Sequence, residues 1–273
     1  GEAPVPVVAP QSPGDCFEAA VEATRIAVTY RTPVMLLSDG YLANGSEPWR
    51  IPDVADLPAI DPAFATADDL TDSGEFQPYA RDPETLARPW APPGVAGLEH
   101  RIGGLEKADI TGNISYDPAN HQLMTDTRRD KIANIPVPDQ EVAFGETTGK
   151  LAVVGWGSTY GPIKQAVRRS IDKGCSVSHI HIRHIWPLPK NLGELLSGFD
   201  RVLVPEMNTG QFKTVLRDQL LVDAESLTKT TAQPFQIAEL ETAICAYFDD
   251  IEGNEGGEVA PNEQQLPSPV ESE

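Results

Sequence analysis

Apolar and polar positions follow two alternating periods over residues 150–248, and this region has the most regular pattern in the chain. Short apolar runs typical of buried strands occur at 151–155, 177–185 and 201–205. Stretches with apolar residues at helical spacing occur at 162–173, 190–196, 210–221 and 234–247. Because strands alternate with helices, the region is predicted to form a parallel sheet with right-handed crossovers.

The first 46 residues show a shorter pattern of the same kind. A strand candidate at 6–9 precedes a helical pattern at 15–29, for which Asp15 is the predicted cap. A second apolar run, 34–37, has the form of a strand buried on both faces. Two strands and a helix bury too little surface to stand alone, so we expect residues 1–46 to be the end of a larger domain.

Residues 47–149 have a different composition. Prolines recur through the first half, at 48, 52, 58, 62, 78, 83, 89, 92 and 93. Proline fixes φ and removes a backbone donor, which excludes long regular elements there. Aromatic residues recur as well, including Trp49, Phe64 and Trp90, and a disordered linker would be poor in them. The region is predicted to be an extended connector packed on its neighbours, with a helix at 121–133 and a hinge at 144–150.

Charge narrows the choice of partners. The 273-residue chain has a formal net charge of -20, which argues against nucleic acid and against an anionic membrane surface. Residues 249–273 hold eight acidic residues and no Lys or Arg. This segment cannot bury enough apolar surface to offset its ordering entropy, so it is predicted to be a disordered acidic tail.

Cysteine usage and hydropathy favour a cytoplasmic protein. The three cysteines are far apart and include no Cys-x-x-Cys pair, which predicts a reducing compartment and no four-thiolate cluster on this chain. No apolar run approaches the roughly 20 residues that span a bilayer, and the first residues do not resemble a signal peptide.

One group of candidate site residues follows the apolar run 201–205. Glu206, Asn208, Gly210 and Gln211 are placed where a strand ends and a helix begins. Open α/β sheets bind ligands at the carboxyl ends of their strands, which favours a ligand or interface role. Polar residues at this position also cap helices, and the pattern alone leaves both interpretations open.

A second group lies in the connector, where His100 and Arg101 precede the glycine pair at 103–104. A flexible turn with two basic side chains can contact an anion or a partner, or it can be a solvated loop. Neither alternative is excluded by the sequence.

Two further patterns imitate known sites. The glycines of 155–161 have the spacing of a phosphate loop, but Trp156 and Tyr160 crowd them, so a tight turn at a subunit contact is favoured over nucleotide binding. His179 and His181 share one face of a predicted strand while His184 lies on the other, which favours structural or interfacial histidines over zinc.

Asp39 follows an apolar run and is predicted to make local turn hydrogen bonds.

Several segments together resemble the alpha subunit of 2-oxoacid:ferredoxin oxidoreductases, most closely the 2-oxoglutarate type. The segments that carry the resemblance are 32–52, 100–106, 112–118, 155–161, 185–188 and 206–211. They occur in the family's order over residues 1–248. The family's segments that hold the substrate carboxylate are not among them and are expected before Gly1, so the resemblance indicates the C-terminal portion of an alpha subunit.

The resemblance implies a fold, a reaction and partners. Residues 1–46 would be the C-terminal part of a pyrimidine-binding thiamine-type domain, 47–149 a Pro-rich connector packed on partner domains, 150–248 a transketolase-C-terminal-like α/β domain and 249–273 the tail. A beta subunit would bind thiamine diphosphate and magnesium and carry the iron–sulfur cluster, with coenzyme A and ferredoxin as substrates. The reaction would be oxidative decarboxylation of a 2-oxoacid to acyl-CoA.

No residue of this chain is assigned a catalytic, cofactor-binding or metal-binding role by that resemblance. The isolated chain is therefore expected to be inactive, and its physical role is expected to be assembly. The alternative is a non-catalytic α/β module that serves docking or regulation.

Overall fold

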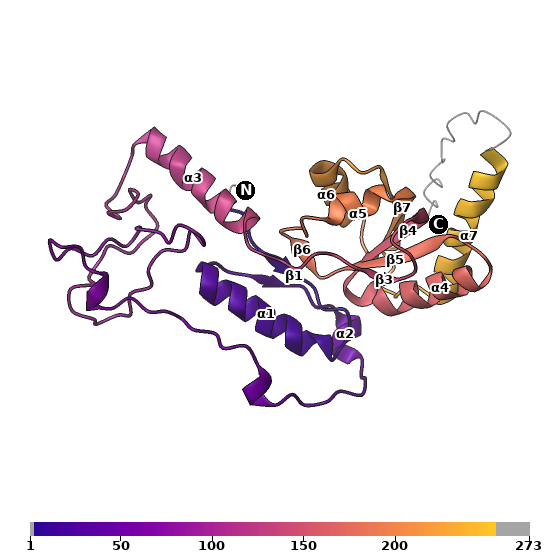
Figure 1. The fold of residues 1–273 in the computed structure, drawn as a ribbon, viewed down its shortest axis with the longest axis horizontal. Helices are drawn as coiled ribbons and strands as arrows, with labels where there is room; N and C mark the ends of the chain where they lie inside the picture. Colours follow the sequence, from indigo (N-terminus) through magenta and orange to yellow (C-terminus); the bar gives the residue numbers. More distant parts are fainter. Residues whose placement is uncertain (1–2, 255–273) are drawn as a thin grey trace, which may run out of the picture.

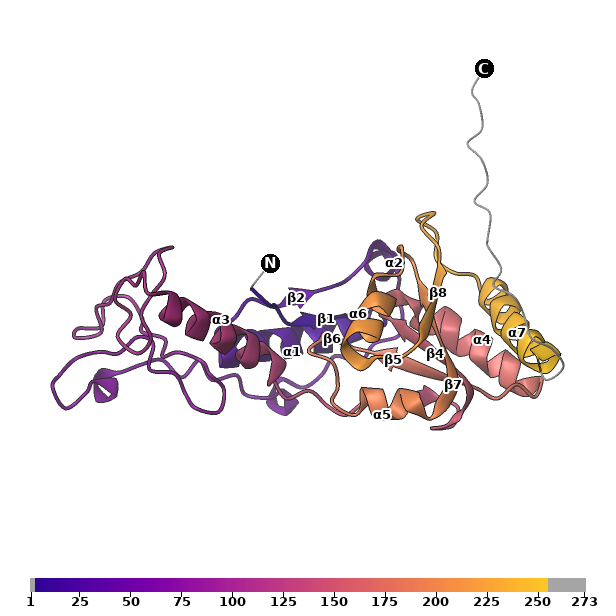
Figure 2. The ribbon, with the colours of Figure 1, turned by 90° about the horizontal axis from the view of Figure 1, so that it is seen from above.

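The computed structural model describes residues 3–254, with side chains described up to residue 248. Its strands form two sheets, one of five strands and one of three. The five-stranded sheet and its helices occupy one end of an elongated molecule, and the connector occupies the other (Figures 1 and 2). The predicted α/β class is confirmed.

The larger sheet has the order β3-β5-β4-β7-β8. Its strands are β3 Val142–Phe144, β4 Gly149–Trp156, β5 Val177–Ile182, β7 Phe199–Glu206 and β8 Ala224–Thr228. β4, β5 and β7 correspond to the predicted strands and are parallel, as expected; β8 is also parallel, and β3 runs antiparallel to β5. The sequence pattern missed β3 and β8 because both are edge strands with half of their side chains toward solvent.

Four helices cover this sheet on two faces (Figure 1). α4 (Tyr160–Asp172) and α7 (Ile237–Asn254) pack on the face that carries Leu151 and Val153. α5 (Leu192–Ser197) and α6 (Gln211–Leu220) pack on the face that carries Ala152 and Val154. Since successive strand residues point to opposite faces, an uninterrupted apolar strand supplies both cores.

The predicted boundary between the last helix and the tail lies inside α7, which continues through residues 249–254. The remaining predicted tail, 255–273, lies outside the described residues. None of the helices in residues 3–254 combines the length and the apolar content needed to cross a membrane.

The smaller sheet has the order β2-β1-β6, from β1 (Val7–Val8), β2 (Met35–Leu36) and β6 (His184–Trp186). β1 pairs with β2 in parallel and with β6 antiparallel. The prediction of one strand over 177–185 is therefore wrong, since the chain leaves the larger sheet after Ile182 and completes the smaller one. β6 therefore lies within the 150–248 region of the sequence but pairs with β1 from residues 1–46.

α1 (Asp15–Tyr30) packs on the smaller sheet, and its core is shared with a distant helix, α3 (Pro118–Ala133). The buried cluster joins Val8 and Ile26 with Ile132 and Ile135. The prediction that 34–37 is buried on both faces is wrong. Met35 is 52% exposed and Leu36 38%, because β2 is the edge of this sheet among the described residues.

Between α2 (Gly40–Asn44) and α3, the connector has no helix longer than three residues. The two short helices are η1 (Val54–Asp56) and η2 (Ala67–Asp69). Isolated bridges hold it in place, among them Phe64 with Trp90, whose rings lie 5.5 Å apart. The prediction that the prolines exclude long elements here is confirmed, and the predicted helix at 121–133 is present as α3.

Candidate functional site

The candidate site lies at the carboxyl ends of β4 and β7, which are neighbours in the larger sheet. The helix that follows β4 packs on one face of the sheet, and the helix that follows β7 packs on the other. Where parallel strands send their helices to opposite faces, a crevice opens between the strand ends, and open α/β sheets bind ligands there.

Glu206 is the last residue of β7 and is fully buried at this crevice. Its Oε1 accepts hydrogen bonds from the backbone N–H of Phe212 at 2.9 Å, from Asn208 Nδ2 at 3.0 Å and from Trp156 Nε1 at 3.3 Å. Its Oε2 accepts from the N–H of Lys213 at 3.1 Å. The carboxylate therefore satisfies free amides at the start of α6, where a negative charge also complements the helix dipole.

Asn208 completes this cap from the loop between β7 and α6. Its Oδ1 accepts from the backbone N–H of Gly210 at 2.7 Å and of Gln211 at 3.0 Å. Gly210 has φ of +88°, and a Cβ there would lie 2.6 Å from Ser226 Oγ, so only glycine fits.

The predicted residues Glu206, Asn208, Gly210 and Gln211 thus come together as a helix cap. Since the first amides of α6 already bind Glu206 and Asn208, this helix end has no free amides for a phosphate. Gln211 is exposed and lines the crevice, so a ligand or interface role for this group stays a prediction.

The glycine-rich segment 155–161 forms the opposite wall. Thr159 Oγ1 donates to the carbonyl of Trp156 at 2.7 Å and accepts from its N–H at 3.2 Å, which closes the turn on itself. A Cβ at Gly155 would lie 2.5 Å from Ile163 Cδ1, so the glycine serves close packing of strand and helix. This arrangement supports the interpretation as a tight turn.

Ser158, in the same turn, is tied to the first region of the chain. Its hydroxyl donates a short hydrogen bond to Asp39 Oδ2, while Asp39 Oδ1 accepts from the N–H of Leu42 at 2.9 Å and caps α2. The predicted local role of Asp39 is confirmed. Its tie to Ser158 spans 119 positions and has no signal in the sequence pattern.

Residues 37–39 thereby close the crevice and leave a pocket of about 300 Å³. Its polar lining comes chiefly from Ser38, Asp39, Ser158, Asn208 and Gln211. Ser158 donates to a carboxylate rather than to a histidine, so the pair is a structural tie and not an activated nucleophile.

Two further contacts, at and next to β6, join the 150–248 domain to α1. Arg183 forms a short ion pair with Asp15, and His184 Nε2 lies 3.3 Å from Glu22 Oε1. Hydrogen bonds from Arg25 and then His184 lower the pKa of Glu22 to about 2. His184 is therefore interfacial between the two regions of this chain.

His179 and His181 lie on the face of β5 that packs against Tyr160, with ring centroids 5.5 and 4.9 Å from the tyrosine ring. Burial lowers the pKa of His179 to about 3, and burial lowers the pKa of His181 well below its ordinary value. Both are neutral core residues at physiological pH. Within the described part of the chain, no three His, Cys, Asp or Glu side chains gather as metal ligands.

His100 and Arg101 belong to the connector, which occupies the end of the molecule away from β7 and α6 (Figures 1 and 2). His100 Nδ1 is 2.8 Å from the carbonyl of Leu98, its ring contacts Phe76, and Arg101 is exposed. The structure does not bring them together with the Glu206 group, and their role as a ligand or interface site stays a prediction.

Comparison with protein families gives two matches. Residues 2–115 match the model of the pyruvate flavodoxin/ferredoxin oxidoreductase, thiamine diphosphate-binding region, and residues 149–240 match that of pyruvate:ferredoxin oxidoreductase core domain II. The second match begins where the predicted α/β domain begins.

Comparison with individual proteins agrees. The chain is 55% identical over 247 residues to the 2-oxoglutarate oxidoreductase subunit KorA of Mycobacterium tuberculosis, covering 90% of this chain and 37% of the relative. It is 31% identical over 245 residues to 2-oxoacid:ferredoxin oxidoreductase 1, subunit alpha, of Aeropyrum pernix, covering 85% of this chain and again 37% of the relative. The chain therefore spans less than two fifths of the length of either protein.

Among solved structures, the 2-oxoglutarate:ferredoxin oxidoreductase of Magnetococcus marinus, with 2-oxoglutarate, coenzyme A and succinyl-CoA bound, superposes with a TM-score of 0.79 at 26% identity. The match covers 90% of this chain and 43% of that one. Because the uncovered tenth of this chain is shorter than either region, the match includes parts of both.

Proposed function

The chain belongs to the family of 2-oxoacid:ferredoxin oxidoreductase alpha subunits, and on that basis we propose that it is part of an enzyme that oxidatively decarboxylates 2-oxoglutarate. In that reaction carbon dioxide leaves, the acyl group passes to coenzyme A, and ferredoxin accepts the electrons. The choice of 2-oxoglutarate among 2-oxoacids is supported by the names of the Mycobacterium tuberculosis and Magnetococcus marinus relatives.

The observation that carries this proposal is the convergence of the family segments at one crevice. Asp39 comes from the segment 32–52, Ser158 from the segment 155–161 and Glu206 from the segment 206–211. These segments are far apart in the sequence, yet they are joined by hydrogen bonds. Ser158 donates to Asp39, and Trp156, from the same turn as Ser158, donates to Glu206. Residues that resemble the family therefore form the contact between residues 1–46 and the 150–248 domain. This is expected of a chain whose role is to hold domains together.

The cofactors of the family are proposed to be held mainly outside this chain, although residues 2–115 match the family's thiamine diphosphate-binding region. No three metal-ligating side chains gather in residues 3–254, and the three cysteines form no disulfide there. The amides at the start of α6 are bound to Glu206. As the family resemblance implies, we propose that thiamine diphosphate, magnesium and the iron–sulfur cluster are bound by a beta subunit, and we derive no chemical step on this chain.

The organisation that goes with this role has four parts. Residues 1–46 contribute to the thiamine-type domain, 47–149 form the connector to partner domains, 150–248 form the C-terminal α/β domain, and the acidic tail follows. The lack of a disulfide among the described cysteines supports a cytoplasmic location.

The test is an activity assay on the native complex, purified from its source with an antibody against this chain. The expected result is ferredoxin reduction that requires both 2-oxoglutarate and coenzyme A and is lost when either is omitted. The isolated 273-residue chain, as a control, is expected to show no activity.

Two outcomes would contradict the proposal. A complex that reduces ferredoxin without any 2-oxoacid would exclude the proposed role in 2-oxoacid oxidation. A chain that is purified without any partner subunit would favour the alternative, a docking or regulatory module. Preference for pyruvate over 2-oxoglutarate would correct only the substrate.

A further inference from the structure

Four cations gather between α3 and the connector, in a chain whose net charge is -20. They are Arg81 and Arg88 from the connector and Arg128 and Lys131 from α3, and we call them the cationic cluster. In so acidic a protein, like charges brought together by folding repel one another unless an anion compensates them.

Side-chain contacts fix the cluster in space. The guanidinium groups of Arg81 and Arg88 lie 5.5 and 5.3 Å from the centre of the same Tyr79 ring. Arg81 Nη2 also lies 3.2 Å from Met124 Sδ on α3. Arg128 and Lys131 follow Met124 at helical spacing, so they share the face of α3 that the connector covers.

Two members of the cluster have acidic partners and two do not. Arg81 pairs with Asp109 at 2.6 Å, and Arg128 Nη1 lies 3.9 Å from Glu106. Among the described residues, neither Arg88 nor Lys131 forms an ion pair with a carboxylate. Burial, followed by the charges of the three arginines, lowers the pKa of Lys131 to about 8.

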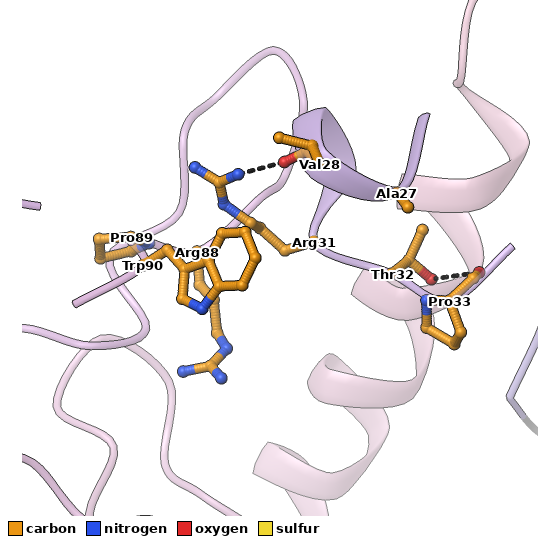
Figure 3. Close-up of a pocket in the computed structure, with 8 residues that line it drawn as sticks. All are labelled: Ala27, Val28, Arg31, Thr32, Pro33, Arg88, Pro89 and Trp90. Atoms are coloured by element: carbon orange, nitrogen blue, oxygen red, sulfur yellow. Dashed lines mark hydrogen bonds between the residues drawn. The ribbon is translucent and has the colours of Figure 1, made fainter. Parts of the chain in front are cut away.

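A pocket of about 370 Å³ opens beside the cluster, between the end of α1 and residues 88–90 (Figure 3). Its walls are mainly apolar and come from Ala27, Val28, Pro33, Pro89 and Trp90. In Figure 3 the Trp90 ring lies between the side chains of Arg31 and Arg88.

Arg31 closes one side of this pocket. Its guanidinium lies 4.8 Å from the Trp90 ring and donates to the backbone carbonyls of Val28, Pro62 and Ala63. These acceptors are neutral, and Asp61 is the carboxylate whose charge acts on Arg31, so Arg31 adds to the positive field around the pocket only in part. Arg88 lines the pocket and also belongs to the cluster, so it connects the two.

We propose that the cationic cluster and this pocket form a binding site for a small anionic ligand. Its phosphate or carboxylate group binds to Arg88 and Lys131, and its apolar part lies against Trp90 and Pro89. Guanidinium groups bind both kinds of anion through paired hydrogen bonds, and of the two proposed contacts Arg88 is exposed and Lys131 is half-buried. The site is distinct from the crevice at Glu206, which has no cationic cluster.

The experiment is titration calorimetry on the full chain at low salt, with inorganic pyrophosphate as the phosphate probe and citrate as the carboxylate probe. At least one probe is expected to bind with a submillimolar Kd. Arg88→Gln and Lys131→Met are each expected to weaken that binding at least tenfold. Far-UV circular dichroism checks that both variants are folded.

Arg129→Gln is the matched control, because Arg129 lies on the same helix, is 62% exposed and pairs with Asp126 and Asp130. It removes the same charge and is expected to leave the affinity within twofold. Equal weakening by Arg129→Gln, or no binding of either probe, would overturn the proposal. Binding of a glutamate-rich peptide but of neither small anion would also overturn it, since the surface would then be a protein interface.

Discussion

The two sheets of this molecule differ in how completely their strands are covered. In the larger sheet, β5 is buried throughout its six residues, and helices cover both faces. In the smaller sheet each strand has two or three residues, and Met35 on its edge is half exposed. The larger sheet is complete within about a hundred consecutive residues, whereas the smaller one depends on α3 and β6 from far along the chain.

This difference teaches that local pattern and local stability are separate properties. α1 is predicted from its helical pattern, as α4 is, but its buried partners include residues 132–137 and Trp186 from far along the chain. A region can therefore be predicted correctly as strand or helix and still be unable to hold its structure by itself.

The largest expected effect is on the stability of the larger sheet. Glu206→Leu would remove a carboxylate that accepts four hydrogen bonds and leave buried donors unpaired. We expect the free energy of unfolding to fall by about 3 kcal/mol or more in urea titrations. The control Glu194→Ala, at an exposed position on α5, should change it by less than about 0.5 kcal/mol. A loss for Glu206→Leu no larger than this control would refute the cap as a stabilising feature.

The second prediction concerns amide hydrogen exchange in the intact chain, which compares the stability of the smaller sheet and the connector with that of the larger sheet. The amides of Leu37 and Tyr79 are hydrogen-bonded at 2.8 and 3.1 Å, like those of β4, but they lie in the smaller sheet and the connector. We expect them to exchange at least about a hundredfold faster than the amide of Val153, equivalent to about 2.8 kcal/mol. Equal protection would show that the whole chain opens as one unit.

Acid should act mainly on the larger sheet, through its buried histidines. The unfolded chain protonates His179 below its ordinary pKa of 6.5, whereas the folded chain does so only near 3, so stability falls as pH falls through this window. The slope is at most about 1.4 kcal/mol per pH unit for this residue, or about 2 kcal/mol by pH 5.

His179→Phe keeps a ring against Tyr160 and should flatten that slope in urea titrations at pH 7, 6 and 5. His121→Gln alters an exposed histidine of α3 and serves as the control. A variant with the full acid sensitivity of the original chain would exclude His179 as its source.

The smallest expected effect concerns the hydrogen bond from Ser158 to Asp39, which joins the 150–248 domain to residues 1–46. A double-mutant cycle of Asp39→Ala and Ser158→Ala should give a coupling free energy of about 1 kcal/mol. Asp39→Ala alone should cost more than Ser158→Ala, because Asp39 also caps α2. Strictly additive losses would mean that the hydrogen bond does not couple the regions in solution.

The sequence predicted the three central strands of the larger sheet and its helices because local periodicity sets them, whereas the edge strands β3 and β8 were missed. The apolar run 151–155 and the glycine at 174 mark a strand and a helix end that need no distant partner. The smaller sheet was harder, since nothing in 184–186 shows that these residues pair with β1.

The candidate site was predictable only in part, for the same reason. Apart from the bond from Trp156, Glu206 and Asn208 accept from residues within seven positions, so their spacing already indicated a cap as one of two interpretations. The tie from Asp39 to Ser158, and the meeting of Arg88 with Lys131, depend on tertiary contacts that the order of residues does not encode locally.

The exchange of β6 into the smaller sheet also sets an order of events during synthesis. Val7 pairs with Trp186, about 180 positions later in the chain. At typical elongation rates of roughly 5–20 residues per second, β1 waits on the order of 10–35 s on the ribosome before its second neighbour is made. During that interval β1 and α1 present an unfinished sheet to chaperones, while the larger sheet, made last and from neighbouring segments, can form soon after its residues emerge.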